Sequence, residues 1–216
     1  MRAKNCVELA KDFLKRKFDE SEYFADKKSE RDYRFEHSVR VANIGKIIAE
    51  KEGMDSDAMV IACLLHDISY CNEFESREDS RNHGRYSAKI ARPFLEEIGM
   101  DPEIIEEICY GIAIHVDDEA DFPGKRTAFA LTVGDADNID RFDAYRIFEN
   151  LKWVKYDEMT LSEKNEHVSR VLERLEKYKN LDFATKASRE MWLEKLEYQI
   201  GFYEKLRAQI ENSELR

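Results

Sequence analysis

Residues 55–67 read Asp-Ser-Asp-Ala-Met-Val-Ile-Ala-Cys-Leu-Leu-His-Asp, a largely apolar run that ends in two adjacent titratable side chains. Such a run predicts a helix that is buried on most sides. His66 and Asp67 at its end need a partner, because an unpaired polar group in the interior is costly. A divalent metal would satisfy both, since imidazole nitrogen and carboxylate oxygen are good metal ligands. The alternative is a core histidine hydrogen-bonded to a nearby acid, which the dipeptide alone favours.

The rest of the chain is typical of an all-α protein. Its 216 residues include only 8 Gly and 3 Pro, too few for the many tight turns of a β-fold. We expect a kink or break at Pro93, and loops over 70–82 and 116–125. Apolar residues at helical spacing predict further helices over 3–18, 36–52, 86–98, 102–115, 127–150, 162–178 and 184–210.

The charge and cysteine content exclude several classes of function. With 35 basic and 46 acidic residues the formal net charge is −11, so general nucleic-acid binding is not expected. A small phosphorylated substrate remains compatible, because a metal can make one pocket locally positive. The four cysteines form no metal-binding pair, and no apolar stretch is long enough to span a membrane. The N-terminus lacks an apolar signal core, which predicts a cytoplasmic location without membrane association.

Four of the five histidines occupy positions that could share one pocket. His37, His66, His83 and His115 each lie at or near the end of a predicted helix, where a bundle can present side chains together. The fifth, His167, follows a polar run and is expected at the surface.

Acidic residues on the predicted helix 127–150 could complete such a pocket. Asp135, Asp137 and Asp140 follow an apolar start that predicts a packed helix, and Asp137 and Asp140 share a face because they are three residues apart. Acids clustered on a packed helix repel one another and need a nearby cation. Histidines and acids on different helices therefore indicate a metal site within a helical bundle.

The order of these residues resembles the H…HD…D signature of the HD-domain superfamily of metal-dependent phosphohydrolases. Residues 34–38 (Arg-Phe-Glu-His-Ser), 62–68 (Ala-Cys-Leu-Leu-His-Asp-Ile) and 135–140 (Asp-Ala-Asp-Asn-Ile-Asp) are similar to the corresponding segments of small stand-alone HD hydrolases. The resemblance covers about 34–145 and, less specifically, the C-terminal tail. It implies a single all-helical domain over 1–216, an HD-domain helical bundle with a metal-binding core at about 34–145 and additional C-terminal helices over about 146–216.

The resemblance also implies the protein ligands of a first metal. By position these are His37, His66, Asp67 and Asp137. Asp135 competes for the last place, but Asp137 aligns with the second acid of the acidic segment, which looks like the ligand position in related hydrolases.

Two further histidines bear on a second metal. In HD branches with a dinuclear centre, two histidines lie between the HD pair and the last Asp, and His83 and His115 occupy that order, with Asp67 as the bridge. In mononuclear branches a histidine near the position of His83 can donate a proton instead. The alternatives are an exposed loop histidine at position 83 and a helix-terminal cation at position 115.

Arg34 lies three residues before His37 and is a candidate phosphate clamp, because a guanidinium matches phosphate oxygens in bidentate geometry. Arg85 and Arg141 are weaker candidates. For each of the three arginines, a surface ion pair on this highly charged chain is at least as good an explanation.

These features predict a metal-dependent phosphohydrolase that acts on a nucleotide or another small phosphate ester. The cofactor would be one or two ions of Mn, Fe, Co, Ni or Zn, because a His-rich site argues against Mg alone. Asp67 would orient the water or take its proton, and His83 or His115 would protonate the leaving oxygen or hold the second metal. A di-iron oxygenase is one alternative. A non-catalytic sensor or structural metal protein is another, although the intact ligand set argues against it.

The last predicted helix carries an apolar and aromatic stripe. Packing on the main bundle is the favoured interpretation of this stripe, and a homodimer interface is the alternative. Its members are Trp192, Leu196, Ile200, Tyr203 and Leu206.

Overall fold

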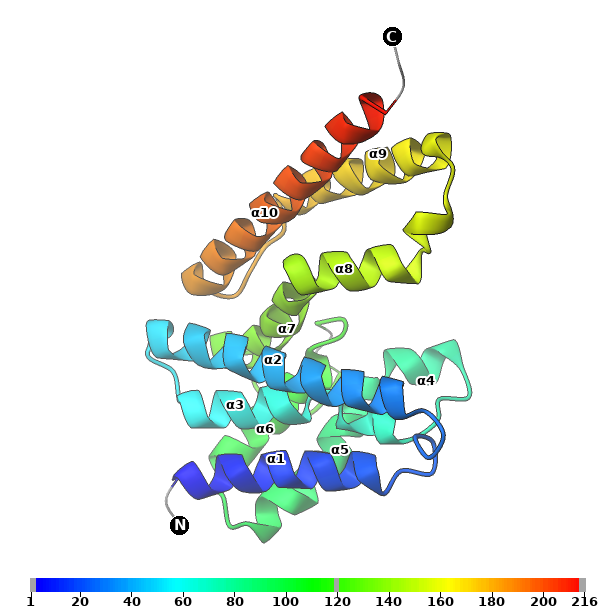
Figure 1. Ribbon diagram of the computed structural model, residues 1–216. Helices are drawn as coiled ribbons and strands as arrows, with labels where there is room; N and C mark the ends of the chain where they lie inside the picture. The colour runs from blue at the N-terminus through cyan, green and yellow to red at the C-terminus, as the bar shows by residue number, and fades with distance from the viewer. Residues whose placement is uncertain (1–2, 119–120, 214–216) are drawn as a thin grey trace. The chain divides into compact units, whose positions relative to one another are not determined.

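The computed structural model describes residues 3–118 and 121–213, which contain helices and no strand (Figure 1). This confirms the prediction of an all-α fold. Two 3-10 turns, η1 (Ile68–Cys71) and η2 (Tyr156–Glu158), supplement the α-helices. In chain order the α-helices are α1 Ala3–Asp19, α2 Lys28–Glu52, α3 Ser56–Leu65, α4 Arg77–Arg81, α5 His83–Glu97, α6 Pro102–Ile114, α7 Ala128–Asp140, α8 Ala144–Trp153, α9 Leu161–Tyr178 and α10 Lys186–Glu211.

The described chain forms two compact units, the first comprising residues up to 138 together with 183–188. The predicted buried helix, α3, is the centre of this unit and packs against α1, α2 and α6. Its apolar side chains account for this position, since Met59, Ala62, Cys63 and Leu65 have no exposed surface. Burial on several sides is what a helix without a polar stripe requires. The expectation of one domain with a helical extension stays a prediction.

Helices α5 and α6 pack against each other in the first unit, and α5 also contacts α1 through the stacked rings of Phe13 and Phe94, 4.1 Å apart. The sequence predicts a kink or a break at Pro93; a break is excluded, because α5 continues from His83 to Glu97 with Pro93 inside it, and a kink stays a prediction. Pro93 and Lys89, the residue whose carbonyl proline cannot bond, are both exposed residues of α5.

Three predicted boundaries are corrected. Helix α2 begins at Lys28, eight residues before the predicted start at 36. The predicted loop 70–82 contains part of η1 and all of α4, whose N-cap Ser76 accepts a hydrogen bond from the backbone N–H of Asp79. Helix α5 begins at His83 rather than at residue 86. Polar composition alone does not reveal a capped helix of one turn.

The predicted single helix over 127–150 is wrong. It is divided into α7 and α8, and Asp143 between them adopts φ 91°, which is incompatible with a continuing helix. The Asp143 side chain then accepts a hydrogen bond from the backbone N–H of Ala144 at 2.7 Å. The break therefore coincides with the start of a new capped helix.

The second unit comprises the described residues of 139–182 and those from 189 onward. Helix α9 begins with a capping box between Thr160 and Glu163. Trp192 of α10 packs on the ring of Phe142 at 4.3 Å and donates from Nε1 to the carbonyl of Tyr178 at 3.2 Å. The predicted stripe is buried at Trp192, Leu196, Ile200 and Tyr203. The homodimer stays a prediction.

Residues 183–188 belong to the first unit although the chain on both sides belongs to the second. The backbone N–H of Ala184 donates to Oδ2 of Asp135 at 3.0 Å, and that of Ala187 donates to Oε1 of Glu52 at 2.7 Å. Two carboxylates thus satisfy backbone donors next to the start of α10, where helical N–H groups lack intrahelical partners.

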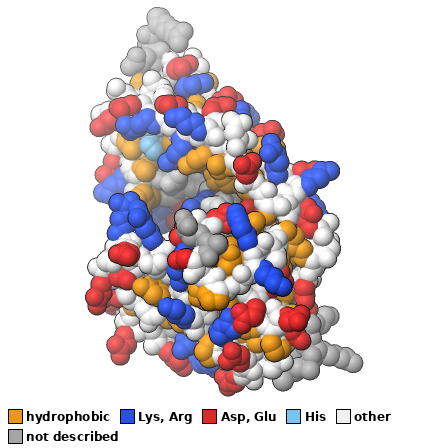
Figure 2. Space-filling model, turned by 180° about the vertical axis from the view of Figure 1, so that it is seen from behind, with side chains coloured by type: hydrophobic (Ala, Val, Ile, Leu, Met, Phe, Trp, Pro, Cys, Tyr) orange, Lys and Arg blue, Asp and Glu red, His pale blue; other side chains and the backbone are white. Residues whose placement is uncertain are grey.

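The surface carries both signs of charge. Figure 2 shows basic and acidic side chains interspersed over the visible face, as expected for a chain in which 38% of residues are charged. Among the described helices, none combines the length and the apolar character needed to cross a membrane.

Asp55 is the N-cap residue of α3, and its substitution tests how much this cap stabilises the protein. Its side chain accepts hydrogen bonds from the backbone N–H groups of Asp57 and Ala58, both at 3.0 Å. We expect Asp55→Ala to lower the free energy of unfolding by about 1 kcal/mol, measured by urea denaturation. Asp55→Asn, which keeps an acceptor, should change it by only a few tenths; an equal loss in both variants would contradict the capping role.

Candidate metal centre

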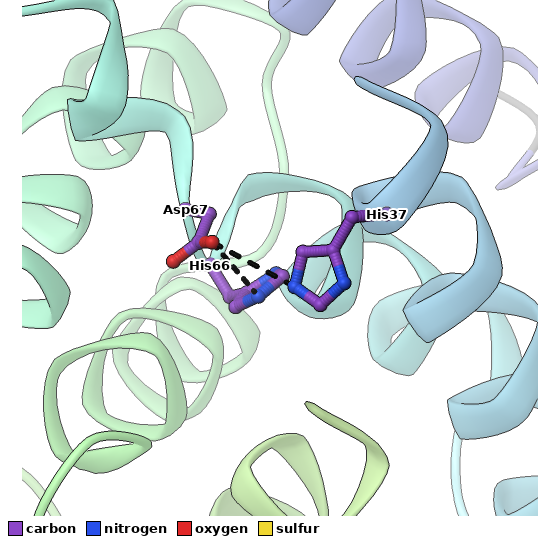
Figure 3. A group of neighbouring side chains, drawn as sticks. All are labelled: His37, His66 and Asp67. Carbon is purple, nitrogen blue, oxygen red and sulfur yellow. Dashed lines mark ion pairs between the residues drawn. The ribbon is translucent and has the colours of Figure 1, made fainter. Parts of the chain in front are cut away.

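Helix ends of the first unit bring the predicted site residues together. His66 is the C-cap of α3 and Asp67 follows it, His115 is the C-cap of α6, and His83 is the first residue of α5. His37 projects from within α2 rather than from its start. Figure 3 shows His37, His66 and Asp67 directed toward one another from α2 and the end of α3.

Three of the histidines share one orienting contact. Their Nδ1 atoms lie 2.7, 2.6 and 2.7 Å from the carbonyl oxygens three residues earlier, those of Cys63, Ser80 and Ile112. A carbonyl only accepts, so each Nδ1 carries the proton and donates it. The Nε2 atoms of His66, His83 and His115 therefore point their lone pairs into the site whenever the rings are neutral.

A first group of ligand atoms surrounds one oxygen of Asp67. Oδ2 of Asp67 lies 3.7 Å from Nε2 of His37 and 3.6 Å from Nε2 of His66. Oδ1 of Asp137 lies 3.1 Å from Nε2 of His37 and 3.8 Å from Nε2 of His66. These two imidazoles and two carboxylates come from α2, α7 and the end of α3, and all four are buried.

A second group surrounds the other oxygen of Asp67. Oδ1 lies 3.1 Å from Nε2 of His83 and 3.6 Å from Nε2 of His115, and the two Nε2 atoms are 3.1 Å apart. Asp67 thus lies between the groups and offers one oxygen to each. The structure places His83 at the start of a helix and partly buried, unlike an exposed loop histidine.

The two candidate acids of α7 face different surroundings. Asp135 accepts the backbone N–H of Ala184, and burial raises its pKa to about 6. Asp137 lies beside His37 and His66. The structure therefore brings Asp137, and not Asp135, to the histidines. Asp140, one turn later, is buried.

The charge of Asp67 and the unpaired ring nitrogen of His66 are what a divalent cation would require of its ligands. Nε2 of His66 is buried and, among residues 3–118 and 121–213, has no hydrogen-bond partner. Burial lowers the pKa of His66 to about 4, so its ring stays neutral and keeps a free lone pair. Burial opposes ionisation of Asp67, but His66, His115 and His83 outweigh it and hold the pKa of Asp67 well below its usual range. A neutral imidazole with a free Nε2 lone pair beside an ionised carboxylate is a typical pair of transition-metal ligands.

The facing nitrogens of His83 and His115 lead to the same conclusion. Two lone pairs 3.1 Å apart repel unless a proton or a metal lies between or beside them. Burial opposes protonation of His83, yet the Asp67 carboxylate and the Ser80 carbonyl outweigh it and raise the pKa of His83. The raised pKa of His83 favours a proton on this ring, and a cation bound to the second group would take the place of that proton.

Arg34 contacts the cluster, whereas the other candidate arginine of this unit does not. Nη1 of Arg34 lies 3.2 Å from Oδ2 of Asp67, and its guanidinium stacks over the ring of Tyr70 at 3.5 Å. Arg85 instead pairs with Asp117 and Asp121. Arg141 and His167 lie in the second unit, where the ring of His167 packs on Tyr156.

Sequence reasoning missed Tyr70 and two buried serines. Ser69 donates from Oγ to the backbone carbonyl of His83 at 2.9 Å, and Ser87 donates to Oγ of Ser69 at 3.0 Å. Ser69 and Tyr70 come two and three residues after Asp67, and Ser87 comes one helical turn after His83. Nearness to the candidate ligands is the signal that could have identified them.

Two comparisons with known proteins concern the family and the fold of this chain. The HD domain family matches residues 34–145, which include all six clustered His and Asp residues. A crystal structure of a predicted HD superfamily hydrolase from an uncultured Thermotogales bacterium is similar with a TM-score of 0.62 and 19% identity, covering 97% of this chain and 99% of that chain. At this identity the likeness concerns the fold. The comparison with curated proteins finds no match. The match over more than half of its length shows that the chain belongs to the HD domain family.

Proposed function

We propose that this chain is a metal-dependent phosphohydrolase that acts on a nucleotide or another small phosphate ester. The observation that carries the proposal is the position of Asp67 between two groups of imidazoles. Oδ2 of Asp67 faces one group and Oδ1 faces the other, and Arg34 contacts Oδ2. A cation-binding cluster with a guanidinium beside it suits a substrate that carries phosphate.

The ligand roles follow from the two groups. His37, His66, Asp67 and Asp137 would hold the first ion, and Asp67, His83 and His115 would hold a second. The nitrogen-rich set favours Mn, Fe, Co, Ni or Zn over Mg. When bound, the metal supplies a water of lowered pKa and neutralises charge on the phosphate.

The remaining steps belong to side chains of this chain. Arg34 binds phosphate oxygens with the N–H groups that Asp67 does not use, and Asp67 orients the attacking water. The water oxygen bonds to phosphorus and gives one proton to Asp67, while the bond from phosphorus to the leaving oxygen breaks. With one ion bound, His83 gives a proton to the leaving oxygen, consistent with its raised pKa; with two ions bound, it is a ligand.

The shared carboxylate also supports a second candidate function, a di-iron oxygenase, because two ions bridged by one acid suit oxygen chemistry. Two assays separate the candidates. Anaerobic phosphate release with Mn or Ni supports hydrolysis, whereas oxygen uptake by the iron-loaded protein without phosphate release supports the oxygenase.

The first experiment is metal analysis of the purified protein, followed by a screen of nucleotides and phosphomonoesters with the metal found. Phosphate release that requires this metal is the expected result. Failure of the whole panel across Mn, Fe, Co, Ni and Zn would contradict the proposed function.

His66→Ala should remove a ligand that the fold leaves without another partner. We expect metal affinity and turnover to fall by more than about 100-fold, the upper range for loss of a residue that only supports a ligand. Circular dichroism should show retained helical content. His167→Ala, which removes a histidine of α9, is the matched control and should retain both properties; metal-dependent activity in His66→Ala would refute the site.

Arg34→Ala should raise KM for the phosphate ester by roughly 10-fold or more, because a charge-assisted hydrogen bond contributes about 1.5–3 kcal/mol. Arg34→Lys should restore part of the affinity, since it keeps the charge but not the planar fork. Steady-state kinetics measures both, with the exposed Arg189→Ala as control. An unchanged KM in Arg34→Ala would exclude the phosphate-binding role.

Metal affinity should depend on pH in a defined direction. Because the pKa of His83 is raised, this histidine keeps a proton over more of the pH range, and metal binding to the second group must release it. We therefore expect affinity to weaken as pH falls from about 8 to about 6. Calorimetry in buffers of different ionisation enthalpy should detect the released proton, and binding without proton release would contradict the assignment.

A further inference from the structure

The second ligand group depends on a close approach of two helices. The first turn of α5 carries His83 and the last turn of α6 leads to His115, and these helices pack against each other. The two Nε2 atoms meet at 3.1 Å only because the backbones that carry them are also close.

Gly84 is the residue at which this approach occurs. A Cβ at position 84 would lie 2.7 Å from the carbonyl oxygen of Ile112, 2.9 Å from that of Ala113 and 3.0 Å from Nδ1 of His115. The two nearest atoms are backbone and cannot rotate away. The Ile112 carbonyl is moreover the acceptor that orients the His115 ring. Any larger side chain would therefore separate the helices and disturb His115.

Buried hydroxyls fix the other side of the same turn. Ser69 donates to the carbonyl of His83 at 2.9 Å, and its backbone N–H donates to Oγ of Ser87 at 3.1 Å. Ser69 and Ser87 are both fully buried. These bonds join the start of α5 to the turn that immediately follows Asp67. They therefore fix the position of the His83 backbone relative to that of Asp67.

We propose that Gly84 and Ser69 are positioning residues that give this centre its capacity for a second metal ion. Gly84 permits the approach of His83 to His115, and Ser69 sets the position of His83 relative to Asp67. Gly84 and Ser69 bear on His83 and His115 of the second group, and in the described interactions neither contacts the side chain of His37, His66 or Asp137. This inference rests on the metal-binding part of the proposed function.

The test is metal stoichiometry, which does not depend on turnover. Protein freed of metal is reconstituted with Mn²⁺, desalted and analysed by inductively coupled plasma mass spectrometry, with electron paramagnetic resonance to detect spin coupling between neighbouring ions. We expect two ions per chain in the wild type and one in Gly84→Ala, with the coupling lost. His83→Ala, which removes a ligand of the second group, should give the same single ion.

Gly201→Ala is the matched control, because Gly201 also lies in a helix and a Cβ there would meet nothing within 4 Å. It should keep two coupled ions. Should Gly84→Ala fail to fold by circular dichroism, Ser69→Ala decides the question, since it removes a hydroxyl without adding volume. We expect it to weaken the second ion by roughly 10–100-fold and to leave the first unchanged.

Two results would overturn the inference: a single ion in the wild type, or two equally tight ions in both Gly84→Ala and Ser69→Ala. These results are distinct from failure of the proposed function. A wild type that hydrolyses phosphate esters with one ion retains the function and refutes the role of Gly84. A wild type that binds two ions, loses one in Gly84→Ala and hydrolyses nothing supports the role and refutes the function.

Discussion

The fold of the first unit is organised around one buried carboxylate. Asp67 is nearly inaccessible to solvent, and four imidazoles and one guanidinium lie beside it. An ionised acid in the interior is tolerated only when compensating charge is close on several sides. Among the helices that supply those partners, α3 and α6 end at this point and α5 begins there, whereas α2 supplies His37 from within its length.

Helix ends can orient the imidazoles around Asp67 because the last carbonyl oxygens of a helix have no intrahelical partners. Each of His66, His83 and His115 uses the carbonyl three residues earlier to hold its Nδ1, which leaves Nε2 for the centre. The same backbone atoms thus finish a helix and orient a ligand. Two of these histidines are C-cap residues, and the third lies two residues after the last residue of the short helix α4.

The residues of this cluster could be named from the sequence because several short segments stand in an order that resembles the HD signature. The apolar run before His66-Asp67 indicates only that the polar pair at its end needs a partner, which a nearby acid could also supply. The choice between Asp135 and Asp137 could not be made by helical geometry alone, because it depends on residues 183–188, nearly 50 positions away, which bind Asp135. The break at Asp143 was missed because a non-glycine residue with positive φ leaves no mark in composition. The close packing at Gly84 could not be predicted from the sequence either, since it depends on backbone carbonyls of another helix, α6.

The return of residues 183–188 to the first unit has a consequence for how this chain folds during synthesis. Glu52 and Asp135 acquire their backbone donors only when Ala187 and Ala184 have left the ribosome. The unit that carries the HD motif is thus completed after the chain between residues 139 and 182 has been made. A fragment that stops where the family match ends, at residue 145, would leave both carboxylates without these partners. The family match therefore stops before two residues, Ala184 and Ala187, whose backbone donates hydrogen bonds to this unit.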